Sequence, residues 1–168
     1  RHAFGDFRAM LEEVTLSPTM GEYLSHVQNQ KADPVKGTSP DENYAREVQQ
    51  LFTIGLVQLQ PDGTLMLDAE GQPIPTYDQA IINDTAKILT GWTFANQAST
   101  NFTTRPPQLL ATGAPDGTAW MVPMRYSDPQ HDKTEKRIIS TEQAPLSADL
   151  RTLVPAGKTG PEDLKILL

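Results

Sequence analysis

The chain has 168 residues, a net charge of −7 and no cysteine. A chain of this length can build one ordinary hydrophobic core, so a single domain is expected. The negative charge argues against a nucleic-acid partner, because binding to a phosphate backbone needs clustered Lys and Arg. The lack of cysteine excludes disulfides, thiol catalysis and thiolate metal sites within these residues. No apolar stretch approaches the roughly 18 residues that a membrane-spanning helix requires.

Both ends of the sequence suggest that it belongs to a longer protein. It opens on Arg1 without an initiator Met, and residues 161–168 have the pattern of a helix that stops soon after it begins. Glu162 and Asp163 suit the positive end of the dipole of that helix. We therefore expect residues 1–168 to be a fragment of one larger, mostly helical domain.

The first part of the sequence predicts a pair of helices. Residues 4–14 carry apolar side chains at spacings of three and four, which predicts an amphipathic helix whose apolar face enters the core. Ser17 and Pro18 form a helix start signal, and a second short helix with an apolar side is expected from there towards Val27. Residues 29–38 are typical of a loop.

A helix start signal stands at Ser39. Ser39 can cap the first turn, Pro40 fits the first helical position, and Glu42 can complete a capping box. On a regular helix, with about 100° per residue, Asn43 and Glu47 lie beside the stripe that faces the core. The stripe predicted in this way consists of Tyr44, Val48, Leu51 and Phe52, and the opposite side consists of Glu42, Arg46, Gln49 and Thr53.

After residue 55 the apolar period changes to two, and turn residues follow at 61–63 and 68–71. This pattern predicts a small β-hairpin or meander near residues 56–75. A capping box at residues 76–79 then predicts a helix that ends at Gly91. Its predicted apolar face consists of Tyr77, Ile81, Ile82, Ile88 and Leu89.

The next region is expected to be largely irregular, over residues 93–130. From 93 to 117 the composition turns to Thr, Asn, Pro, Gln and Gly without periodicity, which predicts a long loop or insertion. Residues 120–126 suit an extended segment, which Pro123 restricts to an edge position. The sequence as a whole predicts a mainly α fold, with amphipathic helices packed around one core.

Glu47 is the first candidate for chemistry. It follows Asn43 by four residues, so the two are neighbours on a helix surface. A partly buried carboxylate needs a partner unless it takes up a proton. Glu47 could therefore act as an acid, as a base, or as half of a structural ion pair. The structural interpretation is favoured, because ion pairs perturb carboxylates as readily as active sites do.

His131 is the second candidate, and Asp132 follows it directly. Histidine is the usual proton shuttle and metal ligand near neutral pH, and a carboxylate can orient its ring. Adjacent residues rarely serve one another in this way, and the sequence contains no HExxH motif. A loop histidine at a turn after Asp128 is the favoured interpretation. No motif identifies a cofactor or a metal, and neither a GxSxG motif nor a phosphate loop is present.

Several separated motifs resemble the bacterial family called domain of unknown function 1800. They occur in order as Pro40-Asp41-Glu42-Asn43-Tyr44-Ala45-Arg46-Glu47, Leu51-Phe52-Thr53-Ile54-Gly55, Thr90-Gly91-Trp92, and His131-Asp132 with Lys136. The resemblance runs from about Phe4 to Leu168 and implies a mostly helical protein. The signature residues that it implies are Glu42, Asn43, Tyr44, Arg46, Glu47, Gly91, Trp92, His131, Asp132 and Lys136.

The same resemblance implies that the protein is exported, to the periplasm or beyond, because members of the family often look exported. The family has no established activity. A Gly that is common in the family between the His-Asp pair and the Lys is absent from residues 132–136. This departure removes the basis for predicting a tight turn or an anion-binding nest there.

Two hypotheses of function follow. The first is an exported bacterial binding or assembly component that contacts a protein partner through the 93–117 loop or the hairpin. The alternative is a hydrolase or metal-dependent enzyme in which Glu47 and His131 act together, while Arg46 or Lys136 holds an anionic group. The alternative predicts that Glu47 and His131 face one cleft, within about a single water's reach of each other.

Overall fold

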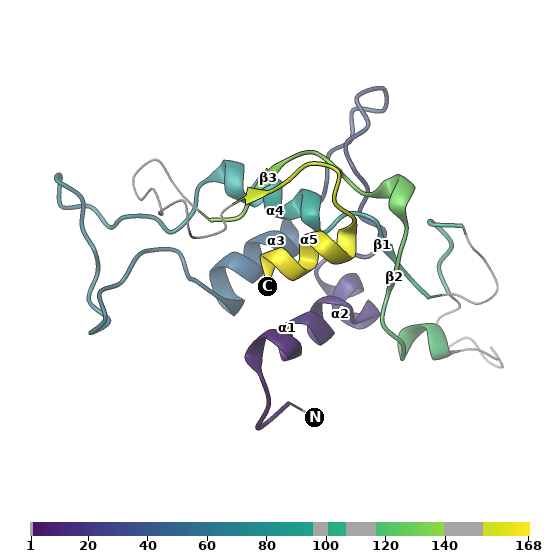
Figure 1. Ribbon diagram of the computed structural model, residues 1–168, viewed down its shortest axis with the longest axis horizontal. Coiled ribbons are helices and arrows are strands. Elements are labelled where there is room, and N and C mark those ends of the chain that lie inside the picture. Colours follow the sequence, from purple (N-terminus) through teal and green to yellow (C-terminus); the bar gives the residue numbers. More distant parts are fainter. Residues whose placement is uncertain (1, 96–100, 107–116, 140–152) are drawn as a thin grey trace.

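The computed structural model describes residues 2–95, 101–106, 117–139 and 153–168 (Figure 1). Within these residues the chain forms five α-helices: α1 (Phe7–Thr15), α2 (Pro18–Tyr23), α3 (Asn43–Glu47), α4 (Gln79–Ile88) and α5 (Gly160–Leu167). It also forms two antiparallel strand pairs: β1 (Trp92–Thr93) with β2 (Arg125–Tyr126), and β3 (Lys136–Arg137) with β4 (Leu153–Val154). A π-helical turn continues α3 over Val48–Phe52, and 3-10 turns occupy Gly117–Trp120 and Asp128–Gln130.

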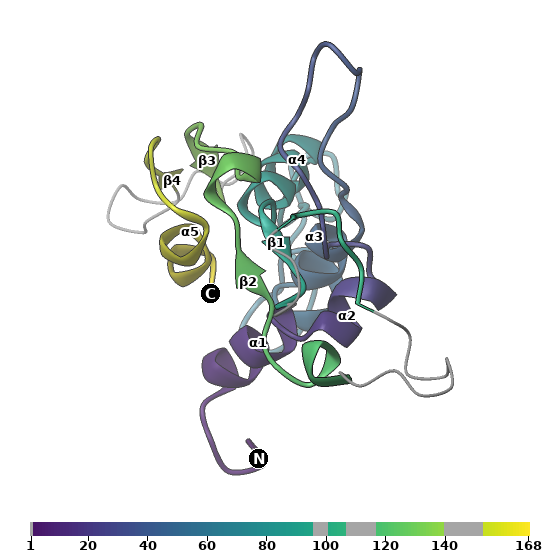
Figure 2. The same cartoon turned by 90° about the vertical axis from the view of Figure 1, so that its right-hand side faces the viewer.

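Helix α4 is the element around which the others are arranged. It contacts α3, β3 and α5, and Figure 2 shows the β1–β2 pair between α5 on one side and α3 and α4 on the other. The side chain of Asp78 caps α4 by accepting a hydrogen bond from the backbone N–H of Ile81 at 2.9 Å. The predicted apolar face is buried, apart from Tyr77, which lies outside the helix: Ile81, Ile82, Ile88 and Leu89. No helix in the described part of the chain has both the length and the apolar character needed to cross a membrane.

The prediction of a mainly α fold around one core is wrong. The described residues form a mixed structure in which buried apolar side chains gather in three clusters. The buried members are Val27, Trp92, Phe94, Met124 and Leu164 in the first, Tyr44, Ala45, Val48, Ala86 and Leu89 in the second, and Ile88, Ile138 and Val154 in the third. Because the helices have only five to ten residues, each buries few side chains, and strands and loops supply the rest.

The region predicted as irregular, residues 93–130, contains paired strands. Trp92 faces Tyr126 and Thr93 faces Arg125 across the β1–β2 pair. Most of the predicted loop at 93–117 lies outside the described residues, so its assignment as a loop or insertion stays a prediction. The prediction that the chain is a fragment of one larger domain likewise stays a prediction.

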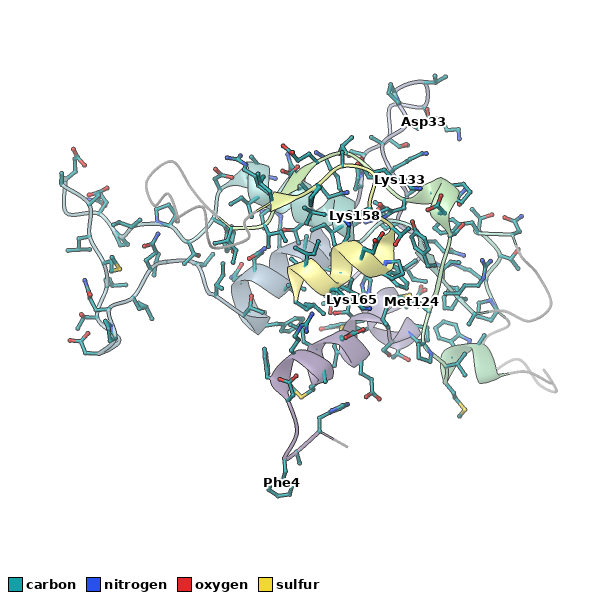
Figure 3. The ribbon with its side chains drawn as sticks, viewed as in Figure 1. Phe4, Asp33, Met124, Lys133, Lys158 and Lys165 are labelled. Carbon is teal, nitrogen blue, oxygen red and sulfur yellow. The ribbon has the colours of Figure 1, made fainter. Side chains whose placement is uncertain are left out.

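Helix α1 buries less than its sequence pattern predicts. Leu11 is buried, but Phe7 is half exposed and Phe4 is fully exposed. Figure 3 shows Phe4 at the outer end of the N-terminal segment, away from the helices. Phe4 lies before the N-cap residue Asp6, so it is outside the helix and does not share its apolar face.

Helix α3 begins later than predicted. Its first residue is Asn43, and the carboxylate of Asp41, rather than the predicted Ser39, accepts a hydrogen bond from the backbone N–H of Asn43 at 2.8 Å. Asp41 is itself held by Asn29, whose amide oxygen accepts from the Asp41 backbone N–H at 2.8 Å and whose amide nitrogen donates to the Asp41 carbonyl. This link within the connection between α2 and α3 fixes where the helix starts.

The π-helical turn changes which residues of this helix face inwards. Gln49, predicted on the outer side, is buried, and its amide donates to Thr85 Oγ1 on α4 at 3.1 Å. Leu51, predicted in the core stripe, is 67 % exposed. A π-helix bonds residue i to i+5 instead of i+4, so a projection at 100° per residue loses its register after Val48.

Residues 56–76 form an arm that extends away from the helices (Figure 1). Its three segments, 56–60, 64–68 and 72–76, each pair with the other two through isolated antiparallel bridges. The central hydrogen bonds close a ring, since Gln58 donates to the Ile74 carbonyl, Ile74 to Met66, and Met66 to Gln58. Antiparallel pairing thus occurs in the predicted β region, but the pairing is a closed triangle and not a regular hairpin.

A buried polar cluster joins α1, the loop after α2, and α3. Thr15 Oγ1 donates to the Leu11 carbonyl at 2.8 Å, and the Tyr44 hydroxyl donates to Thr15 Oγ1 at 2.7 Å. The ring of His26 stacks on Tyr44, with centroids 4.0 Å apart, and its Nε2 donates to the Thr15 carbonyl at 2.8 Å. Burial lowers the pKa of His26 to about 4, so the ring is neutral at pH 7.

We predict that His26 makes the fold sensitive to acid. The pKa of His26 is about 4 when folded and 6.5 at its ordinary value, so the unfolded chain binds the proton more readily between these pH values. The contribution of His26 to the free energy of unfolding is therefore fully present above pH 6.5. It is lost as the pH falls towards 4, by up to ~3 kcal/mol. Urea unfolding at neutral and acidic pH should therefore show a smaller acid-induced loss for His26→Gln than for the wild type.

His2→Gln is the matched control, because His2 lies near the exposed N-terminal end and pairs with Glu13. The His2→Gln variant should lose as much stability in acid as the wild type does. An equal acid-induced loss in His26→Gln and in the wild type would contradict the prediction.

Candidate functional site

His131, Lys136 and Asp163 meet in the interior of the fold. The Asp163 carboxylate accepts two hydrogen bonds on the same oxygen, from His131 Nε2 at 3.0 Å and from Lys136 Nζ at 2.8 Å. All three side chains are fully buried. Lys136 also donates to the Thr134 carbonyl at 2.9 Å, and Asp163 Oδ1 has no hydrogen-bond partner among the described residues. The cluster is therefore a buried ion pair with a histidine on its carboxylate.

Local sequence places Asp163 in this position. Thr159 caps α5 and forms a capping box with Glu162, so the start of the helix does not need Asp163. Asp163 then falls on the inner face with Gly160 and Leu164, at the spacing of a buried helical stripe. Gly160 allows the close approach, because a Cβ there would lie 2.5 Å from the ring of Tyr126.

The ring of His131 faces hydrogen-bond acceptors on both sides. Its Nδ1 lies 2.8 Å from the Thr90 carbonyl, and its Nε2 lies 3.0 Å from the Asp163 carboxylate. Each ring nitrogen therefore contacts a polar group of the protein itself. The ring is thus engaged at both nitrogens and leaves none for a substrate.

The turn after α4 supports this histidine. Thr90 Oγ1 donates to the Lys87 carbonyl at 2.6 Å and accepts from the Asp132 backbone N–H at 2.9 Å. Gly91 follows in the left-handed region, with φ +88°, and its backbone bonds both Asn29 and Ser127. A Cβ at Gly91 would lie 3.0 Å from His131 Cβ. Gly91 is therefore required for both its backbone conformation and its close packing.

Asp132 closes the loop beside His131. Its carboxylate accepts from the backbone N–H of Thr134 at 2.8 Å and from the Thr134 hydroxyl at 2.6 Å. Burial acts to raise the pKa of Asp132, but the Thr134 hydrogen bonds and the charges of Lys136 and Lys87 outweigh it and hold that pKa below its usual value. Asp132 thus stays ionised and shapes the loop.

The remaining signature residues lie on α3 and at the start of β1. Tyr44 is buried, and Trp92 belongs to the first apolar cluster. Glu42 and Arg46 form a partly exposed ion pair at 2.6 Å, which Gln79 of α4 joins by hydrogen bonds to both. The Asn43 side chain is exposed. Glu42 and Arg46 thus fasten α3 to α4, and the hydrogen bonds of the His131 ring go to none of these residues.

Glu47 has different surroundings from His131. It is half buried, its Oε2 has no hydrogen-bond partner among the described residues, and its charge acts on Tyr77. The recorded hydrogen bonds of the His131 ring go to Thr90 and Asp163. The predicted pairing of Glu47 with His131 stays a prediction, and these contacts do not support it.

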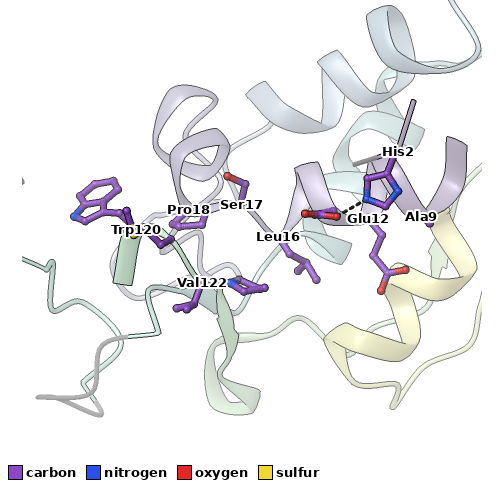
Figure 4. Close-up of a pocket in the computed structure, with 11 residues that line it drawn as sticks. His2, Ala9, Glu12, Leu16, Ser17, Pro18, Trp120 and Val122 are labelled. Carbon is purple, nitrogen blue, oxygen red and sulfur yellow. Dashed lines mark hydrogen bonds and ion pairs between the residues drawn. The ribbon is translucent and has the colours of Figure 1, made fainter. Parts of the chain in front are cut away.

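One cavity borders the site, and another lies apart from it. One of about 300 Å³ is lined in part by Lys31, His131, Asp132 and Lys133, and the side chain of His131 is fully buried. Another, of about 480 Å³, lies between α1 and residues 120–123 and is lined by none of the predicted site residues (Figure 4). Among the described residues, no three His, Asp or Glu side chains are grouped so that they could hold a metal ion.

Sequence reasoning missed Asp163, the residue on which the cluster depends. It was interpreted as a charge that favours the start of a helix. The available signal was the stripe of Gly160, Asp163, Leu164 and Leu167, because these residues share one helical face. An acid within such a stripe must be buried with a partner.

Comparison with known proteins identifies a family. A family model described as "Protein of unknown function (DUF1800)" matches residues 1–160. No curated protein and no solved structure matches the chain.

We predict that Gly91→Ala destabilises the fold more than Gly63→Ala does. Both glycines have positive φ, +88° and +84°, so each alanine costs about 1–2 kcal/mol of backbone strain. Only the Cβ at position 91 meets other atoms, His131 Cβ and Ser127 O, each at 3.0 Å. Overpacking should add roughly 1–3 kcal/mol, measured as the free energy of unfolding. Equal losses in the two variants would show that close packing at Gly91 is unimportant.

We also predict that Asp163→Asn strongly destabilises the fold. The change leaves the buried charge of Lys136 without its counterion, which should cost about 3–5 kcal/mol. Glu162→Gln is the control on the same helix, because Glu162 is exposed and glutamine keeps the capping box. Thermal unfolding should separate the two variants clearly, and similar melting temperatures would contradict the role given to Asp163.

Proposed function

The chain belongs to the DUF1800 family of proteins of unknown function, and we propose that it acts as a binding or assembly component without catalysis of its own. The observation that carries this proposal is the internal use of the polar signature residues. His131 and Lys136 share one buried carboxylate, and Asp132 holds its own loop. Side chains used in this way stabilise a fold, so their presence in the interior does not require a substrate.

The proposed partner is a protein. A nucleic acid is disfavoured by the net charge of −7. We also propose that the protein works after export, in the periplasm or outside the cell, and this part rests on the family resemblance alone. Fractionation of a bacterium that carries the full-length protein tests it, since recovery from the cytosol alone would contradict export.

The alternative, a hydrolase or metal-dependent enzyme, requires Glu47 and His131 to act on one substrate or metal. General acid and base catalysis needs a group within hydrogen-bond reach of the reacting proton. Both ring nitrogens of His131 instead contact groups of the protein itself, Thr90 and Asp163. The binding proposal therefore agrees better with the geometry.

Elemental analysis tests the metal-dependent form of the alternative. The full-length protein, purified without chelator, should contain no stoichiometric metal, either as the wild type or as His131→Ala. His131→Ala should instead lower the melting temperature, because it removes a buried partner of Asp163. A stoichiometric metal in the wild type that is lost in His131→Ala would overturn the proposal and favour the enzyme.

A further inference from the structure

The arm at residues 56–76 presents apolar side chains that nothing in the described structure covers. No residue from 50 to 80 is buried. Six large apolar side chains of the arm and its base are between 37 % and 67 % exposed: Leu51, Ile54, Leu56, Leu59, Leu65 and Leu67. Figure 3 shows that the side chains of the arm project from the extended chain with no other element beside them.

This exposure is unusual for a folded monomer. Single exposed apolar side chains are normal, but a contiguous group of them marks an interaction surface or an aggregation risk. The ring of hydrogen bonds that joins Gln58, Met66 and Ile74 fixes the three segments in place. Ordering the segments costs conformational entropy, which burial within the arm does not offset. Burial of the leucines against another surface would offset it.

The charge of the arm indicates what that surface contains. Between Arg46 and Lys87 the sequence has no Lys or Arg. The two turns of the arm carry Asp62, Asp68 and Glu70. The backbone N–H and the hydroxyl of Thr64 hydrogen-bond Asp62 and lower its pKa, which keeps the carboxylate ionised at neutral pH. The arm is thus apolar along its segments and negative at its turns.

We propose that the arm docks on a partner protein whose surface is apolar and rimmed by Lys and Arg side chains. The leucines would supply burial, and the carboxylates would set the orientation and the rate of encounter. This inference rests on the proposed binding function and specifies its surface and its partner. A second copy of the chain fits less well, because two arms carry the same charge. The anionic surface of a membrane would repel the arm for the same reason.

The test uses the chain and two labelled amphipathic helical peptides, one built of Leu and Lys and the other of Leu and Glu. Fluorescence anisotropy should show binding of the Leu and Lys peptide, weakened several-fold when salt is raised to about 0.5 M. The triple variant Leu59→Ser, Leu65→Ser and Leu67→Ser should bind at least about tenfold more weakly. Because no residue of the arm is buried, this variant should keep the wild-type melting temperature.

A second triple variant isolates the charge. Asp62→Asn, Asp68→Asn and Glu70→Gln removes the three carboxylates, while Asn keeps the oxygen that each turn uses as an acceptor. Its binding should also weaken and should lose most of its dependence on salt.

The matched controls lie elsewhere on the surface: Val35→Ser with Met121→Ser for apolar exposure, and Glu12→Gln, Glu22→Gln and Glu135→Gln for charge. Both controls should bind like the wild type.

Several results would overturn the inference. Equal binding of both peptides would show that the arm is merely adhesive. Unchanged binding in both arm variants would place the contact elsewhere. Self-association in the ultracentrifuge that the leucine variant abolishes would identify a second copy as the occupant. Arm-dependent binding to phosphatidylcholine vesicles would identify a membrane. The elemental analysis of His131→Ala is independent of these results, so failure of this inference and failure of the proposed function can be told apart.

Discussion

The carboxylate of Asp163 holds together parts of the chain that are far apart in the sequence. It lies 32 residues from His131 and 27 residues from Lys136, and it contacts both with no exposure to solvent. Removing these charged groups from water is costly, so the arrangement is stable only when each charge has its partner in place. The end of α4, strand β3 and helix α5 must therefore assemble together. The third apolar cluster, around Ile88 and Ile138, packs beside this assembly.

The corner after α4 explains why the signature motifs of the sequence lie where they do. Thr90 and Gly91 end the helix, and their backbone and hydroxyl groups bond three loops that would otherwise have unsatisfied polar groups. His131 packs against Gly91 and bonds Thr90. Residues from two motifs thus form one structural unit. Such residues are restricted by the fold as strictly as catalytic residues are restricted by chemistry, which is why a motif alone does not distinguish the two.

The π-helical turn after α3 separates the body of the protein from its exposed arm. It turns Gln49 inwards, where its amide bonds Thr85 on α4, and it turns Leu51 outwards. From that point the chain leaves the core and does not return until α4. One local change of helical period therefore both fastens α3 to α4 and starts the apolar surface for which we infer a partner. The buried contact of Gln49 and the exposed position of Leu51 both follow from this one segment.

The sequence by itself determined the features that depend on neighbouring residues. The apolar face of α4, the start of α2 at Pro18, the β-type period after residue 55 and the surface pair of Glu42 with Arg46 all follow from spacings within one or two turns. Family membership also followed, since its motifs are local strings.

Only the tertiary structure decided the rest. It replaced one core by three clusters, moved the start of α3 through the contact of Asn29 with Asp41, and placed Asp163 beside His131. Those outcomes depend on contacts between distant residues, whose free energy is fixed by burial and by charge pairing, and neither is encoded in a spacing along the chain.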